Sequence, residues 1–117
     1  MSITANRQAI AAELAAVMGE AFPVTTDPRS VNPPCVLVAA GDGFAPASCG
    51  WTGIVPVWLL VPGPANLDAL EAAETMLDLV RLARVTIASP ARNDIYMTDP
   101  AGETGLFGYV FEVLLTS

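Results

Sequence analysis

The stretch Trp51-Thr-Gly-Ile-Val-Pro-Val-Trp-Leu-Leu-Val61 predicts one long β-strand that is apolar on both faces. Alternate residues of a strand point to opposite faces of the sheet. One row here contains Val55, Val57, Leu59 and Val61, and the other contains Ile54, Trp58 and Leu60. Pro56 lies in the middle and cannot donate a ladder hydrogen bond. We therefore expect the strand to lie at a sheet edge or to carry a bulge there.

An amphipathic helix is predicted after this strand, over residues 66–84. Asn66 is a suitable N-cap, and Asp68 and Glu71 place negative charge in the first turn. The apolar face repeats at helical spacing and comprises Leu67, Leu70, Ala73, Leu77 and Val80, widened by Met76, Leu79 and Ala83. A chain of 117 residues has one helix layer to offer. The second apolar face of the strand therefore needs another cover, and we expect a second copy of the protein.

The residues before the long strand predict a helix, a connector, a short strand and a loop. The helix spans residues 4–19, with an apolar stripe of Ile10, Leu14, Val17 and Met18. A proline-rich connector leads to a strand over residues 35–39. Residues 40–50 are rich in glycine, so we expect a flexible loop with Phe44 at its tip as a docking residue. The loop lacks a lysine and the spacing of a phosphate-binding loop.

The C-terminal part predicts two more strands, over residues 91–98 and 106–115. A turn signal, Asp99-Pro-Ala-Gly102, separates them, and we expect a hairpin. The element order is then α-β-β-α-β-β. It predicts an α+β fold in one domain, residues 1–117, with a mainly antiparallel four-stranded sheet and two helices packed on one face.

Composition restricts the functions open to this chain. Hydrophobic residues make up 53%, charged residues only 15%, and the net charge is −7. The low charge content suggests that part of the surface is an interface. An acidic chain without a basic cluster is a poor nucleic-acid binder. The sequence contains no histidine and no lysine, so it predicts no catalytic, cofactor-binding or metal site, and no enzyme. The carboxylates of Glu71, Glu74 and Asp78 are interpreted as a solvated helix face.

Two cysteines, Cys35 and Cys49, are expected to be reduced thiols of a cytosolic protein, although their pairing stays open. The first residues lack the apolar core of a signal peptide. The longest apolar run, residues 53–64, is too short to span a bilayer, so no membrane partner is expected.

Several segments resemble the tail terminator proteins of long-tailed bacteriophages. They are Asn32-Pro-Pro-Cys-Val-Leu-Val38, the apolar long strand, the helix entry Asn66-Leu-Asp-Ala-Leu70 and the C-terminal strand. The resemblance implies a homo-hexameric ring that caps the tail tube, stops its polymerisation and presents a surface to a head-completion or connector protein. DNA would pass through the ring without specific binding. Such proteins assemble in the host cytoplasm and reside in the virion, at the junction between tail and neck.

The resemblance also implies that the sheet, rather than the helices, faces the bore of the ring. Six copies at −7 would carry a formal charge of −42, and an acidic bore would repel DNA and let it slide. We expect Glu112, Asp94 and Asp42 to line that bore. Contacts with neighbouring subunits or partners are expected from the following apolar side chains: Trp58, Leu60, Val110, Phe44 and Trp51.

Two other functions fit the same observations. A head–tail stopper of the phage neck would share the small size and the acidity. A small cytosolic ligand-binding domain, with a pocket under residues 41–50, belongs to a different class of protein. The assembly state and the form of phage tails distinguish these alternatives.

Overall fold

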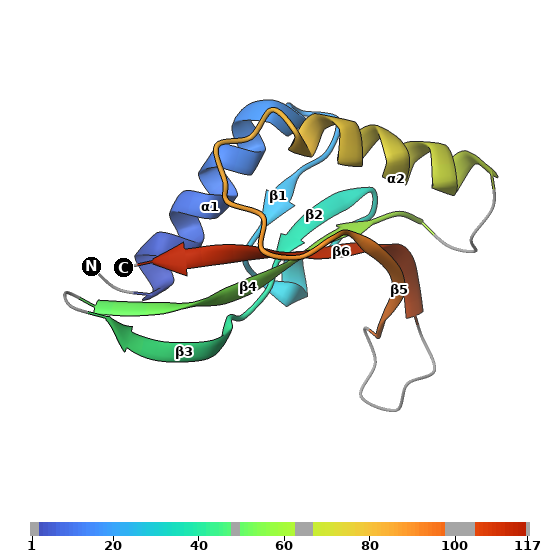
Figure 1. The fold of residues 1–117 in the computed structure, drawn as a ribbon. Coiled ribbons are helices and arrows are strands. Elements are labelled where there is room, and N and C mark those ends of the chain that lie inside the picture. Colours follow the sequence, from blue (N-terminus) through green and yellow to red (C-terminus); the bar gives the residue numbers. More distant parts are fainter. Residues whose placement is uncertain (1–2, 48–49, 63–66, 98–104, 117) are drawn as a thin grey trace.

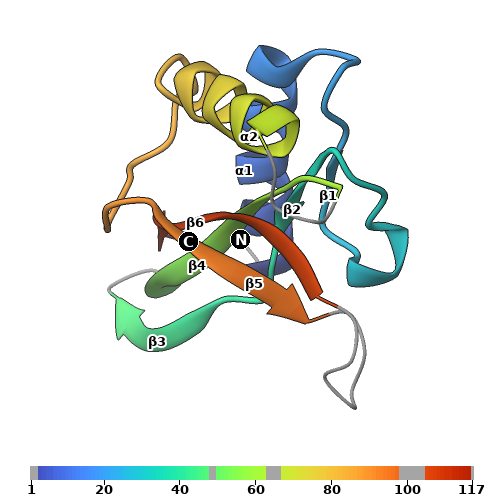
Figure 2. The same ribbon diagram turned by 90° about the vertical axis from the view of Figure 1, so that its right-hand side faces the viewer.

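The protein consists of two helices packed on one face of a mixed β-sheet, an α+β fold (Figures 1 and 2). A computed structural model describes residues 3–47, 50–62, 67–97 and 105–116. The elements in chain order are α1 (Ile3–Met18), β1 (Val24–Thr25), a 3-10 turn (Pro28–Ser30), β2 (Cys35–Val38), β3 (Asp42–Ala47), β4 (Gly50–Leu60), α2 (Leu67–Val80), β5 (Arg92–Met97) and β6 (Gly105–Thr116). The predicted fold class is confirmed, as is the placement of both helices on one side.

The sheet contains six strands, in the order β1-β2-β4-β6-β5, and β3 pairs with β4 outside this path. The four predicted strands are present, and β5 and β6 form the expected antiparallel pair. Only β1 and β2 run parallel. The predicted number of strands was too low because β1 has two residues and β3 lies in a segment that we expected to be a loop.

Strands β4 and β6 form the centre of the sheet. They pair antiparallel without interruption from Thr52 opposite Thr116 to Leu60 opposite Gly108. One of the two predicted rows, formed by Val55, Val57 and Leu59 of β4 and by Val61 just after it, is fully buried beneath the helices. The facing side chains come from both helices and from β6: Leu14, Met76, Phe111, Val113 and Leu115. Burial of this row is the main source of stability, at about 25 cal/mol for each Å² of apolar surface removed from water.

Pro56 lies in a central strand, so the expectation of an edge position or a bulge in β4 is wrong. The carbonyl oxygen of Pro56 accepts a hydrogen bond from the amide of Ala39 at 2.9 Å. In a strand, the nitrogen of a residue faces the same side as its oxygen. The nitrogen of Pro56 therefore faces the gap between Val38, where β2 ends, and Asp42, where β3 begins. The proline interrupts no ladder because the neighbouring strand changes at this point.

Residues 42–47 form β3, which corrects the prediction of a flexible loop over residues 40–50. The register of β3 against β4 shifts between Asp42 and Ala45, and Gly43 adopts a positive φ of 61° within the shift. The ring of Phe44 lies over Gly41 and Gly53, where it occupies the positions that their Cβ atoms would take. These two glycines form a flat floor for the ring, and this contact fixes a segment whose composition is typical of loops.

Helix α1 agrees with its prediction. Ile10, Leu14 and Met18 are buried against the sheet and α2, and Val17 is partly buried beside them. Gly19 follows the helix with a φ of 67°, and its amide donates to the carbonyl of Ala15 at 3.2 Å. This is the C-terminal cap that a glycine in the left-handed region provides.

Helix α2 ends earlier than predicted, and its buried face agrees with the prediction at Ala73, Met76 and Val80 but not at Leu67. It ends at Val80, where tight turns follow, rather than at Arg84. The buried stripe is Ala69, Ala73, Met76 and Val80, whereas Leu67 is 68% exposed. Ala69 and Ala73 let the backbone of α2 approach its neighbours closely. This packing determines which side of the helix faces the core.

The orientation of α2 is tested by two truncations. We expect Met76→Ala to lower the free energy of unfolding by about 2–5 kcal/mol, because Met76 is fully buried under the sheet. The matched variant Leu67→Ala should change it by less than about 0.5 kcal/mol. Urea denaturation measures both values. A larger loss for Leu67→Ala than for Met76→Ala would contradict the observed face.

Candidate functional site

The face of the sheet opposite the helices, here called the helix-free face, carries most of the residues predicted to function. Residues directly opposite each other in a ladder point to the same face. The register therefore assigns the following side chains to it: Cys35 and Leu37 of β2; Ile54, Pro56, Trp58 and Leu60 of β4; Leu106, Val110, Glu112 and Leu114 of β6; and Arg92, Asp94 and Tyr96 of β5. This face divides into a covered half and an open half.

The covered half is a second apolar cluster built from the chain itself. Cys35, Leu37 and Leu60 are fully buried there. The side chains that cover them are Val31, Ala39, Trp58, Tyr96 and Leu106. The rings of Trp58 and Tyr96 meet edge to face, with centroids 5.2 Å apart and an interplanar angle of 62°. The expectation that another copy must cover this face is therefore wrong for this half.

Two predicted interface residues belong to the covered region. Leu60 and Val110 are both buried within the single chain. A side chain that its own chain already removes from water has no surface left to offer a neighbour. A third predicted interface residue, Trp58, is only partly buried, so it still presents surface on the helix-free face.

The open half lies along the other ends of β4 and β6. Ile54 pairs with Leu114, and Pro56 pairs with Glu112. Leu114 is 43% exposed, and Ile54 and Pro56 are partly buried. We call Ile54, Pro56 and Leu114 the open patch. It is a small apolar surface with a carboxylate on either side, because Asp42 of β3 lies opposite Ile54.

The three acids predicted to line a bore all lie on the helix-free face. Asp42 comes from β3, Glu112 from the centre of β6 and Asp94 from β5, opposite Gly108. Their carboxylates do not form a cluster: within the described ranges, no group of three acidic or cysteine side chains is placed to hold a metal ion. Asp42 and Asp94 are exposed, and each accepts a hydrogen bond from the next backbone amide, at 2.7 and 2.8 Å.

Phe44 and Trp51 lie apart from the helix-free face. Phe44 is partly buried against the main core, so it is no exposed loop tip. Trp51 belongs to the same row of β4 as Gly53 and Val55, which points toward the helix side, and it is 42% exposed. The structure therefore places these two predicted interface residues on the other side of the sheet from Trp58.

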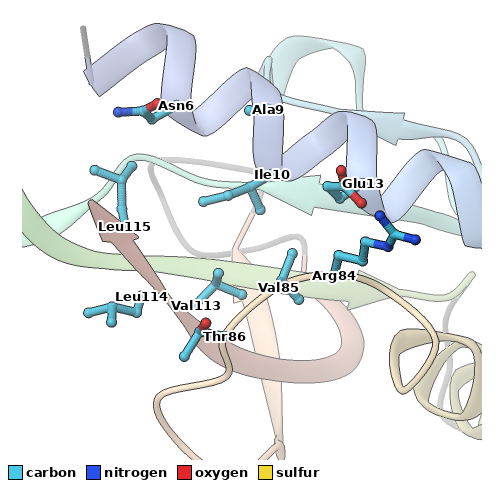
Figure 3. A pocket seen from close by; sticks show the side chains of 10 residues that line it. All are labelled: Asn6, Ala9, Ile10, Glu13, Arg84, Val85, Thr86, Val113, Leu114 and Leu115. Atoms are coloured by element: carbon cyan, nitrogen blue, oxygen red, sulfur yellow. The ribbon is translucent and has the colours of Figure 1, made fainter. Parts of the chain in front are cut away.

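A cavity of about 220 Å³ opens between α1, the segment after α2 and the end of β6 (Figure 3). Apolar side chains such as Ile10 and Leu115 form its floor, and Glu13 and Arg84 lie at its α1 side. The amide nitrogen of Asn6 is buried there without a hydrogen-bond partner among the described residues. Sequence reasoning missed this cavity because its walls come from three distant segments. Its charged lining groups are the carboxylate of Glu13 and the guanidinium of Arg84, and Thr86 adds a hydroxyl.

The pocket expected under residues 41–50 is filled by Phe44, which packs on Gly41 and Gly53. A second hollow, of about 230 Å³, lies beside β5 and is lined by Asn93, Asp94, Ile95 and Phe107. Neither of these two cavities is lined by residues of β3.

The perturbed titratable groups are explained by local contacts. The guanidinium of Arg29 hydrogen-bonds the Asp27 carboxylate at 3.2 Å, which lowers the pKa of Asp27 and raises that of Arg29. Asp27 also caps the short 3-10 turn by accepting from the Arg29 amide. Burial raises the pKa of the Cys35 thiol, and a backbone hydrogen bond with Asn32 partly offsets this. Cys35 is unpaired, and Cys49 lies outside the described residues. These are structural contacts of a turn and a core.

Comparisons with known proteins give no match, so a function can be inferred only from the sequence, the fold and the helix-free face. No protein-family model matches the chain, and a search of curated proteins finds no match. Among the described residues, no helix has both the length and the apolar character needed to cross a bilayer.

The covered half is tested through its thiol. In a Cys49→Ser background, we expect iodoacetamide to alkylate native Cys35 at least roughly a hundredfold more slowly than the unfolded chain, because the buried thiol is shielded and resists ionisation. Equal labelling rates in the native and unfolded states would contradict the burial.

The raised pKa of Cys35 also makes the free energy of unfolding depend on pH. The stabilisation that comes from keeping the thiol neutral is complete below about pH 8.5, and it is lost as the pH rises through the pKa of the folded state.

Proposed function

We propose that this protein is a structural component of a phage tail, a terminator that caps the tail tube as a homo-hexameric ring. The proposal rests on the sequence resemblance and on one structural observation. The helix-free face carries the open patch and three carboxylates, whereas the helices cover the opposite face. In this proposal the ring stops tube polymerisation, joins the tail to a head-completion protein and lets DNA pass.

The distribution of charge supports a bore built from the helix-free face. Asp42, Asp94 and Glu112 occupy three different strands, so their charge is spread across the sheet. Arg92 is the one cationic side chain that the ladders assign to this face. Such a surface repels the phosphates of passing DNA without binding any one of them.

Fewer residues are available for the subunit contacts of the proposed ring than the sequence predicted. Leu60 and Val110 are buried, so the apolar surface of the helix-free face comes from the open patch and from the partly buried Trp58, Tyr96 and Leu106. Exposed apolar side chains in one patch, flanked by carboxylates, are typical of a surface that a partner covers. We therefore assign the contact between neighbouring subunits to Ile54, Leu114 and Trp58.

The direct test is genetic. Deletion of the gene from the phage that carries it should give overlong tails, or tails that do not join heads, in electron micrographs. Plasmid-borne protein should restore the normal tail length. Tails of normal length together with leaky, DNA-empty heads would replace the terminator with the head–tail stopper. Normal particles in the deletion strain would reject both phage functions.

The acidic bore is tested by neutralisation at constant volume. The triple variant Asp42→Asn, Asp94→Asn and Glu112→Gln should still form rings, because these side chains lie outside the apolar contacts. We expect DNA ejection from triggered particles to slow several-fold, because the bore repels phosphates less. Time-resolved fluorescence of a DNA-binding dye measures the ejection.

The matched control removes the same charge from the outer surface of α2. Asp68→Asn, Glu71→Gln and Glu74→Gln also change the net charge from −7 to −4, and all three side chains are exposed. This control should eject DNA at the normal rate. Equal slowing by both triple variants would show that net charge acts, and that the helix-free face has no special position.

A further inference from the structure

The free edges of the sheet differ in how well they are protected against pairing with another chain. An exposed edge strand is a template for an added strand unless a bulge, a proline or short length blocks it. Edge strand β1 has only two residues. Edge strand β3 contains a register shift, the positive φ of Gly43, and Pro46. Strand β5 has none of these features and pairs with β6 in regular register along its length.

The backbone groups on the open side of β5 belong to Asn93, Ile95 and Met97. On β6, the amide of Glu112 donates to the hydroxyl of Ser89, and its carbonyl accepts from the amide of Ala88. Residues 88 and 89 precede β5 on the same side of β6, so the even-numbered residues of β6 turn their backbone groups toward β5. Arg92 and Asp94 lie opposite the even-numbered Val110 and Gly108 and bond inward. The alternate residues Asn93 and Ile95 therefore face outward. The amide of Ile95 is occupied by the carboxylate of its own neighbour Asp94, at 2.8 Å.

We propose that the first half of β5, extended by Ala91, pairs antiparallel with the same segment of a second copy of this chain, about a two-fold axis at Asn93. This register places Arg92 opposite the partner's Asp94, and Asp94 opposite the partner's Arg92. Both pairs lie on the helix-free face, where opposite charges across strands attract. On the other face, Ile95, which is 50% exposed, lies opposite the small side chain of the partner's Ala91.

The charges select this register over its neighbours. Moving the axis by one residue toward the C-terminus places Asp94 opposite the partner's Asp94, and moving it the other way places Arg92 opposite the partner's Arg92. Both alternatives oppose like charges. A shift by two residues toward the C-terminus removes the repulsion but loses both Arg–Asp pairs. Only the register centred on Asn93 gives two opposite-charge pairs.

Pairing sacrifices no existing ion pair, because the ion pairs of the described ranges join Asp27 with Arg29 and Asp78 with Arg81. Arg92 and Asp94 are both exposed and remain available. When the strands pair, the amide of Ile95 exchanges the Asp94 carboxylate for the carbonyl of the partner's Ala91. The carboxylate is then released to the partner's Arg92.

This contact is separate from the proposed ring. A two-fold contact uses the same strand in both copies and closes at two subunits, whereas a ring of six needs two different surfaces on each subunit. The dimer therefore concerns the protein in solution before assembly, and its test does not depend on the terminator function.

Sedimentation equilibrium of the purified protein, at about 0.15 M salt, tests the proposal. At this salt concentration distant charges are screened while paired charges still interact. The unaltered protein should show a reversible equilibrium between monomer and dimer. Arg92→Asp and Asp94→Arg each place like charges opposite one another twice, so each should weaken association roughly tenfold. The double variant should restore the association because it exchanges the two charges.

The matched control is Asp42→Arg. Asp42 is exposed on β3 and accepts from the next backbone amide, as Asp94 does, but its edge is blocked. This variant makes the same charge change as Asp94→Arg and should leave the dimer unchanged relative to the unaltered protein. Circular dichroism verifies that each variant is folded. A strictly monomeric protein, or a dimer that the single exchanges leave intact, or a double variant without rescue, would overturn the proposal.

Discussion

The pairing of β4 with β6 is the contact on which the rest of the structure depends. The two strands are separated by many residues in sequence, yet they pair without interruption from Thr52 opposite Thr116 to Leu60 opposite Gly108. Both strands carry apolar residues on both faces, so the pair is stable only if each face is covered. The helices cover one face, with Leu14 and Met76 as fully buried contacts. The surface that remains available depends on how much of the second face the chain itself covers.

The chain closes that second face only in part. The edge-to-face contact of Trp58 with Tyr96 covers one half, and Val31, which follows the 3-10 turn, packs against the same cluster. The other half keeps Ile54 and Leu114 at the surface. Much of the apolar excess of the composition is therefore buried within the chain, and the exposed apolar side chains lie on several elements, Leu114 being the exposed one in the open patch.

Period-two alternation was enough to predict β4 and its two rows of side chains. It did not predict β3, because the packing of Phe44 on Gly41 and Gly53 is a tertiary contact that composition does not reveal. The covered half was missed for a similar reason, since Trp58 and Tyr96 lie far apart in sequence.

The buried face of α2 and the candidate site also could not be predicted fully from the spacing of residues in the sequence. In α2, spacing identified Ala73, Met76 and Val80 as buried, but it also included the exposed Leu67 and left out the buried Ala69. The three acids were chosen through the family resemblance. Their common face follows from the ladder register, which a single sequence does not provide. The cavity near Asn6 was beyond sequence reasoning because three segments form it.

The central claim is that the open half of the helix-free face is the surface buried on assembly. Hydroxyl-radical footprinting of the free protein and of native particles measures this directly, residue by residue. The account predicts that Leu114 and Ile54 become protected in the particle, while Leu67, exposed on α2, stays as reactive as before. Unchanged reactivity of Leu114 and Ile54, with protection of Leu67 instead, would contradict it.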